Sequence, residues 1–212
     1  DYVEPVTGTE SGTAHIVLAE GDNSIIVVKG ANDHITPDYV KQALPAVQQA
    51  DIVLIQQEIP EDTVDYVSGL CKSFSTPLLL NPAPARPLSP ETIENAAYMT
   101  PNEHEASILF QGLSREEALK RFPCKLFITE GKNGVRYHNG TEERLIPSFP
   151  VEPVDTTGAG DTFNAGFAVA LSEGKDIEAA LRFANRAASL SVLQFGAQGG
   201  MPKRAEVERA LS

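Results

Sequence analysis

From residue 51 to residue 129 the sequence alternates short apolar runs with segments that begin as helices begin, and this alternation restricts the fold more than any other feature. The apolar runs are too short for helices and suit buried strands. Between them, proline and acidic residues follow a capping residue, as in Ser89-Pro90-Glu91. Repeated strand-then-helix units predict an α/β fold, with a parallel sheet covered by helices on both faces. The expected strands are residues 51–56, 77–80, 97–100 and 125–129, and the expected helices begin at Pro60, Ser89, Glu103 and Ser114.

The two ends of the chain follow other patterns. Residues 13–19 and 24–29 are strand-like runs joined by Gly21-Asp22-Asn23, which predicts a hairpin. Thr36-Pro37-Asp38 predicts the start of a helix over residues 38–48. The remaining expected elements are a hairpin of residues 134–138 and 143–149 around Asn139-Gly140, and helices over about 159–173, 176–194 and 203–211.

Composition excludes several classes of function. The 212 residues carry a formal net charge of -12 without a basic stripe, which disfavours a nucleic-acid or anionic-membrane surface. Cys71 and Cys124 lie far apart, a spacing that favours reduced structural thiols over a disulfide framework or a zinc site. The longest apolar runs are too short to span a bilayer, and residues 1–20 lack a signal-peptide pattern. We expect a cytoplasmic protein.

Gly158, Ala159 and Gly160 precede Asp161 at the start of an apolar-faced helix. Such a start offers free backbone N–H groups to an anion, but an acid in a first turn is also common as a simple dipole partner. Two known glycine motifs do not fit. The dinucleotide fingerprint would need glycine where Phe163 stands, and a P-loop would need serine or threonine where Asn133 follows Gly131-Lys132. The local pattern leaves both interpretations open.

Four ordered motifs resemble the ribokinase-like (PfkB) sugar and nucleoside kinases. The stretch Asp155-Thr-Thr-Gly-Ala-Gly-Asp161-Thr-Phe is similar to the C-terminal family motif, and Thr100-Pro-Asn102-Glu-His-Glu105 to its P-N-x-x-E. Residues 129–134 resemble its nucleotide loop, and residues 196–198 the segment after its last long helix. Residues 81–86 and Glu58 are most similar to the ribose-phosphorylating members. The resemblance covers essentially the whole chain and implies a three-layer, Rossmann-like core with a lid hairpin.

The resemblance implies ATP-dependent transfer of the γ-phosphate to a primary hydroxyl, most readily that of D-ribose to give ribose 5-phosphate. Asp161 would be the general base, and the backbone amides of Gly158, Ala159 and Gly160 would stabilise the developing charge. Glu58 and Asp161 would contact the sugar. Glu105 would act on Mg²⁺ through water, and Asn102 near the phosphates, although Asn102 could also be a helix cap.

The nucleotide would lie along residues named by the resemblance, whose local sequence is also ordinary turn chemistry. They are Thr129, Glu130, Gly131, Lys132, Asn133, Gly134 and Asn185. A monovalent cation, K⁺, would bind beside the amides, largely through carbonyl oxygens. The residues implied for it are Asp155, Thr157, Ser191, Gln194, Gly196 and Gly200.

The family's N-terminal part, with its sugar-binding aspartate and glycine-rich sugar loop, has no counterpart in the sequence, so we expect a fragment of a longer kinase. Residues 1–30 would be the lid-like hairpin segment and residues 31–212 an incomplete kinase core. A fructose or nucleoside kinase, and a non-catalytic nucleotide or sugar binder, remain alternatives. The expected partners are a small sugar and ATP, with a homodimer for the intact protein.

Overall fold

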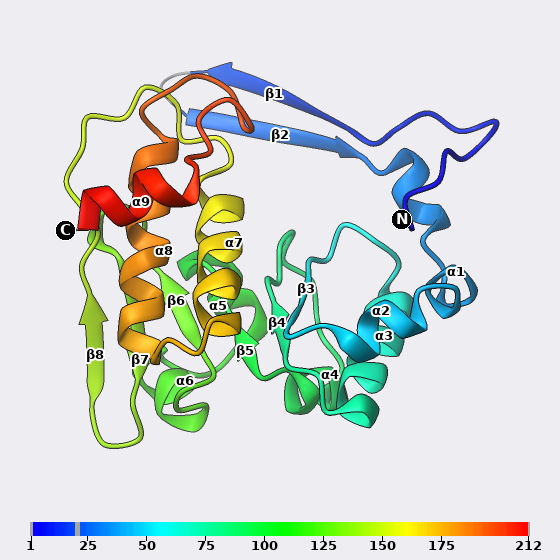
Figure 1. Cartoon of the computed structure of the whole chain (residues 1–212), viewed down its shortest axis with the longest axis horizontal. Coiled ribbons are helices and arrows are strands. Elements are labelled where there is room, and N and C mark those ends of the chain that lie inside the picture. Colours follow the sequence, from blue (N-terminus) through cyan, green and yellow to red (C-terminus); the bar gives the residue numbers. More distant parts are fainter. Residues whose placement is uncertain (1, 20–21, 212) are drawn as a thin grey trace.

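The computed structural model describes residues 2–19 and 22–211, and its centre is a mixed β-sheet with helices on both faces (Figure 1). Strands β3 (Val53–Ile55), β4 (Leu78–Leu80) and β5 (Tyr98–Met99) are parallel. Two parallel bridges, Met99 to Leu126 and Asn102 to Thr129, connect β5 to β6 (Phe127–Thr129). Strands β7 (Val135–His138) and β8 (Glu143–Ile146) then extend the sheet in antiparallel pairing. The order is therefore β3-β4-β5-β6-β7-β8, and the parallel sheet predicted from the sequence acquires an antiparallel end.

Alternate residues along each strand face different helix layers. Leu79 and Phe127 pack in one core cluster with α7 (Ala159–Ser172) and α8 (Ile177–Ser191). Leu78 and Leu80 pack in a second cluster with α3 (Glu61–Phe74), α5 (Glu103–Leu109) and α6 (Arg115–Arg121). All three leucines are fully buried. The predicted three-layer arrangement is confirmed, with α4 (Pro90–Asn95) beside α3 and α9 (Arg204–Leu211) beside α8.

The N-terminal hairpin is also confirmed, as β1 (Thr13–Ala19) paired with β2 (Asp22–Val28). The turn differs from the prediction, because Asp22 and Asn23 already belong to β2, while Gly21 lies outside the described residues. In Figure 1 the hairpin runs across the top of the molecule, apart from the central sheet. A short 3-10 helix, η1 (Gly30–His34), follows it.

The single helix predicted over residues 38–48 is wrong. The structure has two short helices, α1 (Pro37–Lys41) and α2 (Leu44–Gln49). Pro45 lies in the first turn of α2, where its missing N–H costs nothing. In a continuous helix the same proline would leave the carbonyl of Lys41 without a donor and would clash with it. The strand predicted over residues 143–149 is also shorter than expected. Strand β8 ends at Ile146, because Pro147 has no N–H to donate to the ladder.

No helix in the described part of the chain is long and apolar enough to cross a membrane. Cys71 is buried in the second core cluster, and burial raises the pKa of its thiol to about 11. That thiol therefore stays protonated near neutral pH and is a poor nucleophile.

Candidate functional site

The carboxyl ends of four neighbouring parallel strands meet at one edge of the sheet. Strand β3 leads into Gln56, β4 into Asn81, β5 through Thr100 into Asn102, and β6 into Glu130. Open α/β sheets bind ligands outside this edge, because the strands end there and the following loops diverge. The sheet topology therefore brings together polar residues that lie more than seventy positions apart, from Gln56 to Glu130.

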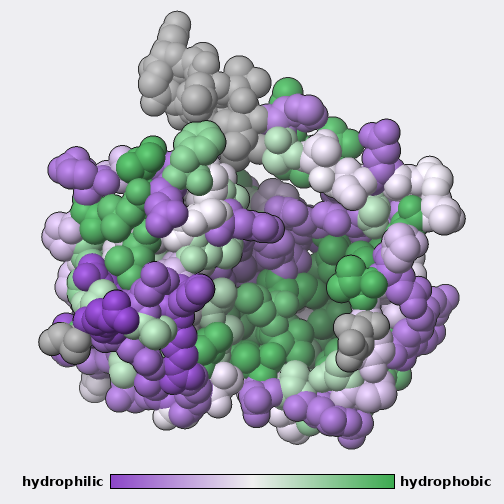
Figure 2. Space-filling model, turned by 45° about the horizontal axis from the view of Figure 1, so that its top comes forward, coloured by the Kyte–Doolittle hydropathy of each residue, from purple (hydrophilic) through white to green (hydrophobic). Residues whose placement is uncertain are grey.

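A cavity of about 350 Å³ opens at this edge beside the N-terminus of α7. Glu58 and Asp161 both line it, and Gln56 Nε2 donates a hydrogen bond of 3.3 Å to Asp161 Oδ1. Figure 2 shows a hollow across this side of the molecule in which hydrophobic side chains gather below a polar rim. The two carboxylates thus share a partly apolar recess. The full lining is Leu54, Ile55, Gln56, Glu58, Ile59, Asn81, Asp161 and Asn164.

The first turn of α7 is built for close approach of another group to its backbone. Gly158 is the N-cap with φ +79°, and a Cβ there would lie 2.6 Å from the carbonyl oxygen of Ala197. Glycine is therefore required by both conformation and space. The Ala159 N–H already donates to Thr156 O at 3.2 Å, whereas the amides of Gly158 and Gly160 find no acceptor among the described residues. These two amides, and that of Asp161, which also has no acceptor among the described residues, are available to an anion.

A chain of buried hydrogen bonds holds this turn against the strand ends. Asn81 Nδ2 donates to the carbonyl of Thr100 at 3.0 Å, and Thr100 Oγ1 donates to Asn164 Oδ1 at 2.5 Å. Asn164 Nδ2 then donates to Gly160 O at 2.9 Å. All three polar side chains are at most 8% exposed. The ends of β4 and β5 are in this way tied to the backbone that precedes Asp161.

The residues expected around a monovalent cation lie mostly in two loops that pack together. Asp155 accepts hydrogen bonds from Thr157 N at 2.9 Å and Thr157 Oγ1 at 2.7 Å with one oxygen, and from Gly196 N at 2.9 Å with the other. Hydrogen bonding, first from the Thr157 hydroxyl, lowers the pKa of Asp155. A Cβ on Gly200 would collide with the carbonyl of Ser191. Gln194 is exposed and makes no hydrogen bond with the described residues.

Asn102 and Glu105 form a reciprocal capping box at the start of α5. Asn102 Oδ1 accepts from Glu105 N, and Glu105 Oε2 accepts from Asn102 N, both at 2.8 Å. The cap considered for Asn102 at the sequence level is therefore present. Burial raises the pKa of Glu105, and the bond from the Asn102 amide opposes this only in part. The second oxygen of Glu105 takes no part in the box.

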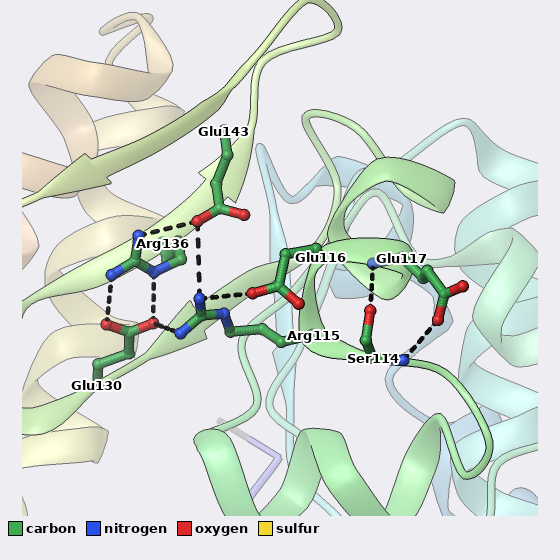
Figure 3. Close-up of polar contacts among 7 residues, drawn as sticks. All are labelled: Ser114, Arg115, Glu116, Glu117, Glu130, Arg136 and Glu143. Carbon is green, nitrogen blue, oxygen red and sulfur yellow. Dashed lines mark hydrogen bonds and ion pairs between the residues drawn. The ribbon is translucent and has the colours of Figure 1, made fainter.

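The loop of residues 129–134 contains the short helix η2 (Gly131–Asn133) after β6. The Glu130 side chain is buried in ion pairs with Arg136 and Arg115 (Figure 3), so it faces the protein rather than a ligand. Asn185 is also buried, and its Nδ2 donates to the carbonyls of Ile146 and Pro147. Glu130 and Asn185, two of the residues predicted to line the nucleotide site, therefore support the loop and the end of β8.

Sequence reasoning missed several residues that shape the site. Gln56 and Thr100 follow apolar runs, where a polar residue at a strand end is the available signal. Asn164 stands one helical turn after Asp161, so a shared helix face could have indicated it. No local sequence pattern indicates that Arg115 and Arg136 bind the same carboxylate. Their common partner Glu130 lies 15 positions from Arg115 and 6 from Arg136, on different elements of the fold.

Comparison with known proteins agrees with this geometry. The model of the pfkB family carbohydrate kinases matches residues 1–204. The chain belongs to the pfkB family of carbohydrate kinases. Membership in this family makes it a phosphotransferase that acts on a sugar.

Individual relatives refine the comparison within that family. The chain is 74% identical over 212 residues to a ribokinase of Bacillus subtilis, covering all of this chain and 72% of that one. A solved ribokinase of Thermotoga maritima superposes with a TM-score of 0.85 at 37% identity, over 96% of this chain and 70% of the other. The ribokinase of Arabidopsis thaliana, solved with ribose and ATP, gives a TM-score of 0.86 at 35% identity over the same shares.

Proposed function

We propose that this chain carries the phosphoryl-transfer site of an ATP-dependent kinase that phosphorylates the primary hydroxyl of D-ribose. The observation that carries the proposal is the position of Asp161. Its carboxylate lines the cavity and follows directly on the free amides of the α7 N-terminus. The high identity to a ribokinase and the likeness to a ribokinase complexed with ribose and ATP support ribose as acceptor and ATP as donor.

In this mechanism the hydroxyl oxygen of the sugar attacks the γ-phosphorus of ATP, and ADP leaves. Asp161 accepts the proton of that hydroxyl during the attack. The amides of Gly158 and Gly160 donate to the phosphoryl oxygens, on which charge accumulates. Gln56 holds the Asp161 carboxylate through the 3.3 Å hydrogen bond and so limits its orientations. Most of the acceleration then comes from position and electrostatics rather than from covalent chemistry.

The cavity lining favours an uncharged acceptor. It includes two carboxylates, Glu58 and Asp161, and three side-chain amides, but no lysine or arginine. Carboxylates and amides bind sugar hydroxyls well, because each hydroxyl can both donate and accept. An acceptor that already carried a phosphate would bring its negative charge beside the two carboxylates. A neutral sugar such as ribose therefore fits better than a sugar phosphate.

The cations belong to the same proposal. A Mg²⁺ that keeps most of its waters and binds phosphate oxygens needs few protein ligands, and the unused oxygen of Glu105 suits such a water-mediated contact. When bound, Mg²⁺ would neutralise charge on the phosphates. The two loops joined by Asp155 and Gly196, with the Ser191 carbonyl beside Gly200, suit a K⁺ held by oxygen atoms. Thr157 and Gln194 would complete that set.

Residues 129–134 and Asn185 would support the nucleotide, chiefly through the backbone of the loop. A homodimer through the hairpin is part of the proposal for the longer kinase. Ile26, Val27 and Val28 of β2 are 46–59% exposed, and a second hairpin could cover them. Measuring the molar mass of the longer kinase in solution tests the homodimer separately.

The test uses a chimera in which these 212 residues replace the matching segment of the Bacillus subtilis relative. We expect ATP-dependent phosphorylation of ribose, with fructose and a nucleoside as competing acceptors. Asp161→Asn should lower kcat by about 10²–10⁴-fold while nucleotide binding persists, because only the proton acceptor is lost. Preference for another acceptor would refute the ribose assignment, and an unchanged kcat in Asp161→Asn would refute the role of the base.

A further inference from the structure

Glu130 is the most deeply buried ion-paired acid of the described residues, and it lies in the loop of residues 129–134 proposed to support the nucleotide. Its side chain is only 3% exposed. Arg136 of β7 binds it with two hydrogen bonds, Nε to Oε1 at 2.6 Å and Nη2 to Oε2 at 3.0 Å. Arg115 of α6 adds a third, from Nη1 to Oε1 at 3.3 Å. Figure 3 shows both guanidinium groups converging on this carboxylate.

The same arginines reach outward to further acids. Arg136 Nη1 donates to Glu143 Oε1 of β8 at 2.8 Å, and Arg115 Nη2 donates to Glu116 Oε1 at 2.7 Å. The pKa of Arg136 is raised, first by the hydrogen bond with Glu130 and then by Glu143. The cluster therefore joins the end of β6 to β7, β8 and α6. A carboxylate so buried is tolerated because its charge and its lone pairs are both satisfied.

The backbone of Glu130 is fixed as firmly as its side chain. Its N–H donates to Gly134 O at 2.8 Å, and its carbonyl accepts from Asn133 N at 3.0 Å, which closes the loop on itself. Ser148 Oγ donates to the carbonyl of Lys132 and ties the loop to the chain after β8. The position of one side chain is thus coupled to the backbone of residues 129–134. Moving the carboxylate would move the loop.

We propose that Arg136, with Arg115 as a second arm, is a positioning residue for nucleotide binding, acting through Glu130. This inference rests on the proposed function, which places the donor nucleotide at the loop. The arginines have two effects. They hold the loop backbone in its binding conformation, and they neutralise a carboxylate that would otherwise repel the phosphates of ATP. Neither arginine is proposed to contact the nucleotide itself.

The test replaces Arg136 in the 212-residue chain and in the chimera. Arg136→Met keeps the unbranched stem of the side chain and removes the guanidinium group with its charge. We expect the Kd of the chain for ATP, measured by calorimetry, and the KM of the chimera for ATP to rise roughly 10–100-fold, because small displacements of a binding group cost that much. The KM for ribose should stay within about twofold, since the sugar cavity is lined by other residues. Arg136→Lys should recover part of the affinity, because lysine restores the charge without the bidentate geometry.

Two further variants separate the mechanism from a general loss of stability. Adding Glu130→Gln to Arg136→Met removes the charge that only Arg115 still pairs and should restore the electrostatic part of the affinity for ATP. Arg144→Met is the matched control, because Arg144 lies on β8 with the exposed partners Glu142 and Glu178, and it should leave the KM for ATP unchanged. Hydrogen exchange of the amides of residues 130–134 should accelerate in Arg136→Met and not in the control.

The outcomes are distinguishable. If the chimera fails to phosphorylate ribose, the proposed function fails, while ATP affinity and loop exchange in the chain still decide the role of Arg136. If Arg136→Met lowers the unfolding temperature but leaves ATP affinity, the KM for ATP and loop exchange unchanged, the positioning role is refuted. If Arg136→Met does not fold, Arg136→Lys and Arg115→Met are judged by the same criteria.

Discussion

Removing the hydroxyl of Thr100 tests whether the buried chain of hydrogen bonds holds the turn that precedes Asp161. Thr100→Val keeps the shape of the side chain but takes away the only donor to Asn164 Oδ1 among the described residues. Thr100 is 1% and Asn164 4% exposed, so water cannot readily replace that donor. An unsatisfied buried acceptor costs about 1–3 kcal/mol of unfolding free energy. For a chain of this size that corresponds to a fall of roughly 2–12 °C in the unfolding temperature.

The fall in kcat of Thr100→Val should exceed what its loss of stability alone would cause. Asn164 also donates to Gly160 O, so a side chain freed from Thr100 no longer fixes the first turn of α7. We expect kcat of the chimera to fall about tenfold or more when measured well below its unfolding temperature. Thr100→Ser keeps the hydroxyl and should retain most of the activity. If Thr100→Val matched the wild type in both unfolding temperature and kcat, the hydrogen-bond chain would have no positioning role.

Two other predictions test the glycine turn and the paired loops. Gly158→Ala should lose at least about 1–3 kcal/mol of stability from its left-handed backbone and its contact with Ala197, whereas Gly160→Ala, whose Cβ would meet no atom within 4 Å, should fold normally in the same thermal unfolding assay. The pKa of Asp155 in the folded chain lies below its ordinary value of 3.8. The ionised carboxylate therefore stabilises the fold fully above about pH 3.8, and this stabilisation is lost as the pH falls from there through the lowered pKa. The difference in unfolding temperature between wild type and Asp155→Asn should therefore narrow below about pH 4, and a constant difference would show that hydrogen bonding to the carboxylate is not its source.

Much of the fold was predictable because local signals agreed with the tertiary structure. Apolar runs marked the four parallel strands of the central sheet, the Asn139-Gly140 turn marked the β7–β8 hairpin, and Ser89 and Ser114 cap their helices as expected. Two of the errors occur at prolines, where a periodic pattern continues but a backbone donor is missing. Pro45 divides one predicted helix in two, and Pro147 ends β8 early.

The site was predictable only where the sequence itself required special backbone geometry. The glycines before Asp161 were compatible with an anion-binding turn and with a plain helix start, and Gly158 has the left-handed conformation that explains the residue type. The hydrogen bond from Gln56 to Asp161 joins residues 105 positions apart, and the one from Thr100 to Asn164 spans 64. Such pairs depend on which strands become neighbours. A single sequence does not contain that information in any local pattern.

The charge distribution explains why the glycine turn, and not the basic residues, indicates where phosphate is proposed to bind. The chain has a net charge of -12, and no basic side chain lines the cavity, yet the proposed donor is a polyanion. Arg115 and Arg136, which might have supplied a positive field, are bound to three glutamates. In the proposed mechanism the attraction would come from the α7 amides, from Lys132 of the loop and from the cations proposed to bind there. Backbone dipoles act only over the first turn, so they stabilise charge at the transferred phosphoryl group without attracting anions to the whole surface. A protein of this charge can therefore handle ATP through a few amides whose only trace in the sequence is glycine.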